Sequence, residues 1–305
     1  MEKVLVLLST YNGEGFLCEQ LDSLIAQEGV DISVLVRDDG SSDGTWNILI
    51  QYQKKYPKLF ELIQGDNIGC ALSFTELLKE AFERYLDFNR FAFCDQDDVW
   101  LPLKLKSALD NLKEEDDTLP LSYCSNTAIV DIALNFEKMN WREDEVVITK
   151  KRSLIQSFAT GCTMVFNRIA LEIYVKHIPD TIWVHDYQMY QICVFLGKVV
   201  WDSNSYILYR QHGKNQLGAN KGFWGKMKKR TEGRFKEHIY ELQGKRFLES
   251  LRPLLTKDDI ILLTKFVFYK KNIISKLELL LDRDIKYSNF ESNFFFLLKV
   301  IIGSI

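Results

Sequence analysis

The sequence lacks a strong excess of either charge. Its 305 residues carry 39 Lys and Arg against 42 Asp and Glu, which gives a formal net charge of -3. A dedicated nucleic-acid-binding protein needs a marked basic excess, so the charge balance argues against nucleic acid as a partner. A chain of this length can bury a sizeable core, as one large domain with an appendage or as two smaller domains.

The sequence also lacks any cysteine pairing pattern. Its six cysteines form no Cys-x-x-Cys pair and no cluster with histidine, which excludes a zinc or disulfide framework. Several of them stand in apolar contexts, where a free cysteine packs as a small hydrophobic residue. We therefore expect a reducing compartment, the cytoplasm.

No apolar run approaches the roughly 18 residues that a membrane-spanning helix needs. The start, Met1-Glu2-Lys3 followed by five apolar residues, is too short and too quickly polar for a secretory signal. We expect neither a signal peptide nor a membrane span.

What the sequence does contain, over residues 1–112, is an alternation of strand and helix patterns. Strands are predicted at 4–8, 32–36, 60–63 (a weaker signal) and 91–94, and the continuous apolar runs at 4–8 and 91–94 are typical of buried strands. Helical patterns with one apolar face lie between them. This alternation predicts an α/β fold with a mainly parallel sheet flanked by helices, in which the polar loops after the strands meet at one edge.

The second half of the chain is less regular. The predicted strands are 121–125, 128–131, 162–166, 199–201 and 206–209, the predicted helices are 168–176 (capped by Asn167) and 186–196 (ended by Gly197), and 135–152 is irregular. The composition changes after Gly218, and 258–281 has a helical pattern. We predict one domain at 1–220, with halves at 1–112 and 121–220, and a helical C-terminal region at 221–305.

The apolar run at 91–94 ends in Asp95-Gln96-Asp97-Asp98. Three carboxylates so close together repel one another, and a divalent cation would relieve that repulsion. Mg²⁺ and Mn²⁺ take oxygen ligands and often share them with a substrate's phosphates. The alternative is an ordinary acidic surface loop.

The first two strand exits carry further polar loops. Gly13-Glu14-Gly15 fits neither a P-loop nor a dinucleotide-binding motif, and an ordinary strand-to-helix turn is the alternative. Asp38 and Asp39 follow the second strand. A carboxylate there can accept a hydrogen bond from the imide N–H of uracil or thymine, or it can cap a helix.

Four segments taken together carry a resemblance. Ser9-Thr10-Tyr11-Asn12, Asp38 to Thr45, Asp66-Asn67-Ile68-Gly69 and Asp95 to Asp98 resemble, in order, the motifs of family 2 glycosyltransferases, which have the Rossmann-like GT-A fold. The resemblance implies a nucleotide-diphosphate sugar donor that lies across the strand exits.

The resemblance also implies roles for single residues. Thr10, Tyr11 and Asn12 would line the nucleotide pocket, Asp39 would read the pyrimidine, and Asn67 with Gly69 would border the nucleoside. Asp95 and Asp97 match the Asp-x-Asp pair that binds Mn²⁺ or Mg²⁺ on the diphosphate, with Asp97 the more direct ligand. The cation stabilises the charge that the leaving diphosphate gains.

In the second half, residues 159–164 resemble the family's acceptor strand, and Trp183-Val184-His185-Asp186-Tyr187 resembles the segment that carries the base. Inversion at the anomeric carbon needs one base opposite the leaving group. Asp186 is our candidate. His185, where the family more often has Glu, is the alternative base, and Asp186 could instead serve only as a helix cap.

Residues 209–213, Tyr-Arg-Gln-His-Gly, resemble the segment that closes over the diphosphate. This implies Arg210 as a phosphate contact and His212 as a third metal ligand. A solvated loop is the alternative.

The C-terminal region suggests a surface contact. Residues 221–236 hold seven cations against one acid, with aromatic residues interleaved, and residues 294–302 are almost all apolar. The first pattern suits an anionic membrane or a solvated helix, and the second suits interfacial anchoring or a homodimer contact. We expect peripheral association with the inner face of the cell membrane, where a lipid-linked glycan acceptor would lie.

The segments 94–100 and 209–213 look most like those of bacterial rhamnosyltransferases that build surface polysaccharides. This implies an inverting, metal-dependent transfer of L-rhamnose from dTDP-L-rhamnose to a glycan. A UDP-hexose or UDP-N-acetylhexosamine donor is an alternative. A nucleotidyltransferase would need a basic residue in the loop at 10–15, which has none, and a non-catalytic glycan-binding protein would leave the acids without a role.

Overall fold

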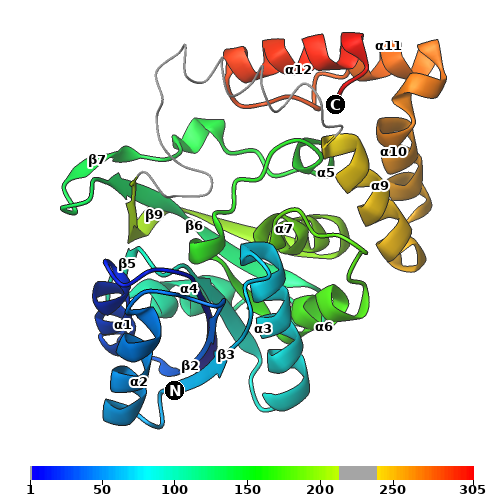
Figure 1. Ribbon diagram of the computed structural model, residues 1–305. Coiled ribbons are helices and arrows are strands. Elements are labelled where there is room, and N and C mark those ends of the chain that lie inside the picture. The colour runs from blue at the N-terminus through cyan, green and yellow to red at the C-terminus, as the bar shows by residue number, and fades with distance from the viewer. Residues whose placement is uncertain (1, 213–238) are drawn as a thin grey trace. The chain divides into compact units, whose positions relative to one another are not determined.

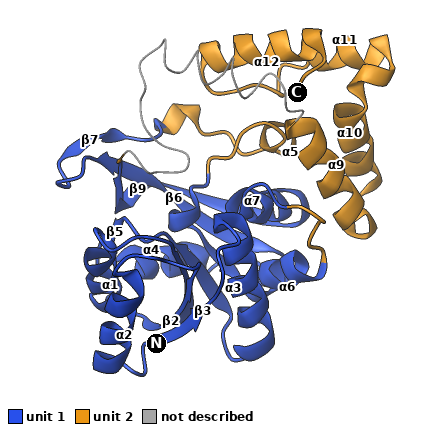
Figure 2. Cartoon of the chain, in the orientation of Figure 1, with its two compact units in different colours: residues 1–142, 159–176, 182–211 blue, residues 143–158, 177–181, 212–305 orange. Residues whose placement is uncertain are grey.

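The computed structural model describes residues 2–212 and 239–305 (Figure 1). The chain forms two compact units (Figure 2). The first comprises residues 1–142, 159–176 and 182–211, and the second comprises 143–158, 177–181 and 212–305. The predicted boundary near 220 lies outside the described residues. Two segments that we assigned to the acceptor half, 143–158 and 177–181, belong to the second unit.

The first unit is built on four parallel strands, which lie in the order β3-β2-β1-β4. They are β1 (Lys3–Thr10), β2 (Asp31–Asp38), β3 (Phe60–Gln64) and β4 (Arg90–Cys94). Alternate residues of β1 point to opposite faces, and residues 4–8 are fully buried on both. This burial on two faces explains the continuous apolar runs of the sequence.

The sheet continues through β8, β6, β9 and β5, and β7 pairs with β6. These strands are β5 (Val99–Trp100), β6 (Leu121–Val130), β7 (Phe136–Met139), β8 (Val165–Asn167) and β9 (Lys198–Arg210). β8 is antiparallel to β4 and β6, whereas β6 and β9 are parallel, so the sheet is mixed. The two strands predicted at 121–131 form one strand, as do the two at 199–209, because β6 and β9 continue through register shifts between Ser125 and Ala128.

Helices cover both faces of the sheet (Figure 1). One face is covered by α1 (Leu17–Ile25), α2 (Thr45–Lys55) and α4 (Lys104–Leu112), and the other by α3 (Cys70–Arg84), α6 (Arg168–Lys176) and α7 (His185–Leu196). Asn167 caps α6 as predicted, because its Oδ1 accepts from the N–H of Ala170 at 3.0 Å. α7 ends at Gly197 as predicted. A Cβ at Gly197 would lie 1.9 Å from the carbonyl oxygen of Pro120, so only glycine fits there.

The second unit is helical in the part that the structure describes. It contains α5 (Lys150–Ser153), α9 (Ile239–Leu251), α10 (Lys257–Val267), α11 (Ile273–Leu281) and α12 (Phe290–Ile302). The helical pattern at 258–281 is two helices. α10 ends at Val267 with Phe268 as its C-cap, and Asn272 caps the start of α11 by accepting from the N–H of Ile274 at 2.8 Å. None of the described helices is long and apolar enough to cross a membrane.

Candidate active site

The carboxyl ends of three parallel strands meet at one edge of the sheet. Thr10 at the end of β1 pairs with Asp38 at the end of β2, and Leu8 pairs with Cys94 at the end of β4. The three loops that follow these strands are therefore neighbours, as the alternation of elements predicted.

The loops after β1 and β2 hold each other through polar side chains. The Thr10 hydroxyl donates to Asp38 Oδ1 at 2.9 Å. The N–H of Asn12 donates to Ser41 Oγ at 2.9 Å, and its Oδ1 accepts from the N–H of Ser42 at 2.8 Å. Asn12 has φ 47, a left-handed conformation that a non-glycine residue adopts only when its surroundings hold it. These contacts fix the predicted nucleotide loop in one conformation.

Asp39 ties the end of β2 to the start of α3. Its carboxylate accepts from the N–H groups of Ile68 at 3.0 Å and Gly69 at 2.9 Å, and it forms a buried ion pair with Arg37. Asn67 and Gly69 are exposed beside it. Recognition of the pyrimidine base by Asp39 stays a prediction. The carboxylate would accept the imide N–H of the base while keeping its hydrogen bonds to the N–H groups of Ile68 and Gly69.

The loop after β4, residues 95–98, which we call the acid loop, brings three carboxyl groups together, of which Asp98 is buried and Asp95 and Asp97 are half-buried. Burial raises the pKa of Asp95 to about 8, and the nearby charges of Asp97 and Asp186 add to that rise. Asp98 is completely buried, and burial raises its pKa well above the usual range, with Asp97 adding to the effect. One oxygen of Asp98 accepts from the N–H of Arg210 at 3.1 Å. Among the described residues, no N–H or O–H group donates to the other.

The donor atoms here fit a hard divalent cation. Clustered carboxyl groups whose pKa values are raised by burial and mutual repulsion would lose their protons to solvent when a Mg²⁺ or Mn²⁺ ion binds. The Cys162 thiol lies within 4.8 Å of Asp95 and Asp98. Burial raises the pKa of that thiol well above its usual range, so it stays protonated and the available ligands are oxygens.

Arg210 holds the acid loop from behind. Its side chain is buried, and Nε donates to the carbonyl oxygen of Asp97 at 2.9 Å while Nη1 donates to that of Ile132 at 2.6 Å. It also forms an ion pair with Glu19. The phosphate contact of Arg210 stays a prediction. His212 is the first residue of the second unit, and its role as a metal ligand likewise stays a prediction.

Asp186 lies in the first turn of α7. Its Oδ2 accepts from the N–H of Gly161 at 2.9 Å, and a Cβ at Gly161 would lie only 3.0 Å from that oxygen. Burial raises the pKa of Asp186 to about 6, against the lowering effect of the N–H groups of Tyr187 and Gly161. Gly161 precedes Cys162, whose thiol lies within 4.8 Å of Asp95 and Asp98, so the hydrogen bond from Gly161 puts Asp186 beside the acid loop. The charge of Asp186 in turn raises the pKa of Asp95.

His185 lies in an apolar environment. Its ring stacks on Phe74 with centroids 3.9 Å apart and meets the edge of Phe93 at 4.7 Å. Neither ring nitrogen has a hydrogen-bond partner among the described residues. Burial lowers the pKa of His185 to about 3. This neutral, apolar setting argues against His185 as the base.

Two residues of the site escaped the sequence analysis. Gln96 bonds the backbone of Tyr11 with both ends of its amide. Lys104 is 1% exposed, its Nζ lies 3.4 Å from the centre of the Trp100 ring, and burial lowers its pKa to about 8. For Gln96, the only signal in the sequence is its position between Asp95 and Asp97 in the Asp-x-Asp motif. Nothing in the sequence marks Lys104, which reads as the exposed start of a helix.

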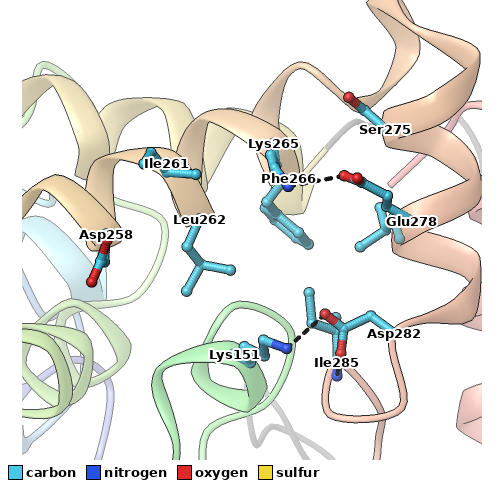
Figure 3. Close-up of a pocket in the computed structure, with 11 residues that line it drawn as sticks. Lys151, Asp258, Ile261, Leu262, Lys265, Phe266, Ser275, Glu278, Asp282 and Ile285 are labelled. Atoms are coloured by element: carbon cyan, nitrogen blue, oxygen red, sulfur yellow. Dashed lines mark hydrogen bonds and ion pairs between the residues drawn. The ribbon is translucent and has the colours of Figure 1, made fainter.

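A separate cavity of about 410 Å³ lies in the second unit (Figure 3). Both lysines that line it are paired with carboxylates that also line it: Lys265 with Glu278 at 3.0 Å and Lys151 with Asp282 at 2.9 Å. The hydrogen bond between Lys151 and Asp282 raises the pKa of the lysine and lowers that of the aspartate, so both groups stay charged near neutral pH and neither is suited to exchange a proton. The candidate active site is therefore the edge of the sheet in the first unit.

Comparisons with known proteins identify relatives of the chain by sequence and by fold. The family model described as "Glycosyl transferase family 2" matches residues 5–174. The dTDP-rhamnosyl transferase RfbG of Shigella flexneri is 31% identical over 232 residues, 73% of this chain and 77% of that protein.

Two solved structures share the fold. S. aureus TarS, residues 1–349 in complex with UDP-GlcNAc, superposes with a TM-score of 0.60 at 17% identity over 100% of this chain and 82% of its own. The mannosyltransferase PcManGT from Pyrobaculum calidifontis, in complex with GDP-Man and Mn²⁺, gives a TM-score of 0.53 at 15% identity over 99% and 86%.

Proposed function

The chain belongs to glycosyl transferase family 2 and has the GT-A fold of a glycosyltransferase, and within that family we propose that it is an inverting, metal-dependent rhamnosyltransferase. It would transfer L-rhamnose from dTDP-L-rhamnose to a hydroxyl group of a glycan or lipid-linked glycan. The observation that supports the reaction type is the hydrogen bond of Asp186 to Gly161, which precedes Cys162 beside Asp95 and Asp98 at the strand exits. The sugar rests on the similarity to a dTDP-rhamnosyl transferase.

The donor would lie across the three strand exits. Thr10, Tyr11 and Asn12 would line the nucleotide pocket, since their loop is fixed by the contacts of Thr10 to Asp38 and of Asn12 to Ser41. Asp39 would accept the imide N–H of the pyrimidine. Asn67 and Gly69, which are exposed beside Asp39, would border the nucleoside.

Asp95 and Asp97 would hold a Mn²⁺ or Mg²⁺ ion, with His212 as a third ligand. When bound, the ion supplies positive charge against the charge that develops on the departing nucleoside diphosphate. Arg210 would keep the backbone of Asp97 in place through the hydrogen bond to its carbonyl oxygen. Asp98, buried beneath, would hold the loop through its contact with the N–H of Arg210.

Asp186 would act as the base. Its carboxylate would take the proton of the acceptor hydroxyl as that oxygen attacks the anomeric carbon from the side opposite the leaving diphosphate. A pKa of about 6 keeps it deprotonated near neutral pH yet basic enough to accept the proton. The N–H of Gly161 would orient it, because that group donates to Oδ2 at 2.9 Å.

A thermal-shift screen with and without Mn²⁺ tests the donor, because a ligand that binds the folded state raises the unfolding midpoint. We expect dTDP-L-rhamnose with Mn²⁺ to give the largest rise, and dTDP to be released when a glycan acceptor is added. A larger rise with UDP-glucose or UDP-N-acetylglucosamine would identify that nucleotide sugar as the donor, and the protein would still be a glycosyltransferase. Release of pyrophosphate from a nucleoside triphosphate would contradict the transferase reaction, and binding of glycans without any donor effect would contradict enzymatic transfer.

We further propose that the enzyme works at the inner face of the cell membrane. Nine large apolar side chains of α11 and α12 are between 38% and 86% exposed: Ile273, Ile274, Leu277, Leu281, Phe290, Phe294, Leu297, Ile301 and Ile302. In α12 the spacing of Phe290, Phe294, Leu297 and Ile301 puts them on one stripe of the helix. An apolar stripe on a helix too short to span favours a position in the interface of a bilayer. The basic segment 221–236 lies outside the described residues.

Sedimentation with vesicles tests the membrane contact. Anionic vesicles should carry the protein down, and Phe294→Asp together with Ile301→Asp should release it. Leu86→Asp, at an exposed apolar position of the first unit, is the matched control. Concentration-dependent dimerisation that the same double variant abolishes, without vesicle binding, would assign the stripe to a second copy instead.

A further inference from the structure

Gln96 stands between the two proposed metal ligands, but its side chain contacts another loop. Its Oε1 accepts from the N–H of Tyr11 at 2.9 Å, and its Nε2 donates to the carbonyl oxygen of the same residue at 3.0 Å. The amide thus pairs with one residue's backbone in both directions. Two matched hydrogen bonds fix both the distance and the orientation of the loops that they join.

Gly13 provides the space for this amide. A Cβ on Gly13 would lie 2.2 Å from Gln96 Oε1 and 2.5 Å from its Cδ, which no side chain could tolerate without displacing the amide. Two residues further on, a Cβ on Gly15 would meet no heavy atom within 4 Å. The absence of a side chain at position 13 therefore leaves room for the Gln96 amide, whereas position 15 has space for a side chain.

Tyr11 is where the contact matters. Its side chain is 47% exposed at the end of β1, next to Asn12 with its left-handed backbone. A peptide held on one side by Gln96, and followed by Asn12 bonded to Ser41, has little freedom to rotate. The direction in which the Tyr11 ring is presented thus depends on a residue of the acid loop.

We infer that Gln96 is a positioning residue that joins the metal-binding loop to the nucleoside-binding loop, so that Tyr11 meets the nucleotide base in one fixed orientation. This inference rests on the proposed donor site, in which Asp95 and Asp97 bind the metal and Tyr11 lines the nucleotide pocket. Gln96 itself neither touches the reacting atoms nor exchanges a proton. Its effect is on how well the donor binds.

Gln96→Met tests the inference, because methionine keeps the length and the neutral charge but makes neither hydrogen bond. Loss of both bonds should raise the donor KM about tenfold at saturating Mn²⁺, while kcat changes by less than about twofold. Binding of dTMP or UMP without any metal should weaken to a similar degree, which a change confined to the metal site would not cause. Gln51→Met, at an exposed position of α2, is the matched control.

Gly13→Ala gives an independent perturbation. It should raise the donor KM like Gln96→Met, whereas Gly15→Ala should leave it unchanged. In a Gln96→Ala background the clashing amide is gone, so Gly13→Ala should cost nothing further. Such non-additivity is the signature of a direct contact.

Four results would overturn the inference: a normal donor KM in Gln96→Met, a harmless Gly13→Ala, additive effects in the double variant, or a change in the metal requirement alone. Failure of the proposed function looks different, because it appears in the wild-type protein as an absence of nucleotide-sugar binding before any variant is made. That absence would overturn the inference as well.

Discussion

Asp186 and His185 are adjacent in the chain but sit in opposite environments. The carboxylate of Asp186 accepts the N–H of Gly161 beside the acid loop, while the His185 ring packs against Phe74 and Phe93 and has no hydrogen-bond partner among the described residues. Successive side chains in the first turn of α7 point in different directions. His185 therefore packs in the apolar core, while Asp186, the next residue, faces the acid loop.

Asp186→Asn should abolish transfer and preserve donor binding. The amide cannot take the acceptor's proton, so kcat should fall about 10²–10⁴-fold, with a donor affinity like that of wild type in calorimetry. The wild-type kcat/KM should rise with pH through about 6 and then level, because the carboxyl must lose its proton to act. Near-normal turnover in Asp186→Asn would remove this residue from the mechanism.

Gly161→Ala should disturb the same carboxylate from the other side. The added Cβ would approach Oδ2 to 3.0 Å and push it from the N–H that lowers the pKa of Asp186. The acid limb of the pH–rate profile should therefore move above pH 6, with a lower kcat. Gly15→Ala, where nothing lies within 4 Å, controls for the loss of a glycine, and an unmoved limb would contradict the orienting role.

Lys104 supplies a prediction about stability. Burial lowers its pKa to about 8 from 10.5, so between these values the unfolded chain binds a proton that the folded protein does not. Stability from this group therefore rises with pH across that window, by up to about 3 kcal/mol. Urea unfolding of the wild type and of Lys104→Met at pH 7.5, 9 and 10 should show the rise as a difference between the two proteins. A constant difference would place the ammonium in a wetter site than the structure indicates.

At the level of elements, the strand-exit loops are held by one another rather than by the strands alone. Thr10 to Asp38 joins the first two, Gln96 to Tyr11 joins the first to the acid loop, and Arg210 at the end of β9 holds the acid loop from behind. The candidate site is therefore pre-organised before a donor arrives, which favours tight positioning of the transition state.

Arg210→Met distinguishes two roles of this residue. If Arg210 holds the acid loop, the variant should need more Mn²⁺ for half-maximal activity and unfold at a lower temperature, since three carbonyl or carboxylate partners lose their donor. A residue that only contacts phosphate would raise the donor KM and leave the unfolding temperature and the Mn²⁺ requirement unchanged. Arg210→Lys keeps the positive charge but not the planar guanidinium group with its several N–H donors, and should resemble Arg210→Met.

The elements differ in how far the sequence predicts them. The apolar runs of β1 and β4 are continuous because residues 4–8 and 91–94 are buried on both faces, so the sequence predicts these strands, and the acid loop is predicted from its place after β4. β2 is buried only over residues 34–38, which still gives a strand signal. β5 has two residues and β7 is exposed throughout, so neither has a periodic signal. The Gln96 contact spans 85 positions to Tyr11 and depends on a missing Cβ at Gly13, which only three-dimensional packing can bring together.

For the whole molecule, metal binding and stability should be linked through the acid loop. The pKa of Asp95 is raised to about 8 by burial and by neighbouring charges, so below that value a metal ion must displace a proton. Mn²⁺ should raise the unfolding midpoint more at pH 8 than at pH 6, and a chelator should reverse the rise. In Asp97→Ala the Mn²⁺ effect should be lost at both pH values, and its survival there would mean that Asp97 is not the principal ligand.

The chain passes between its two units at residues 142, 158, 176, 181 and 211. A genetic exchange with a relative at a single crossover near 211 would therefore transfer only part of the second unit. It would leave 143–158 and 177–181 from the original parent, where Lys150 pairs with Asp259 and His177 contacts the carbonyl oxygen of Ser250. Recombination that replaces this unit must carry all three segments at once, so the C-terminal helices and these two insertions should have diversified together.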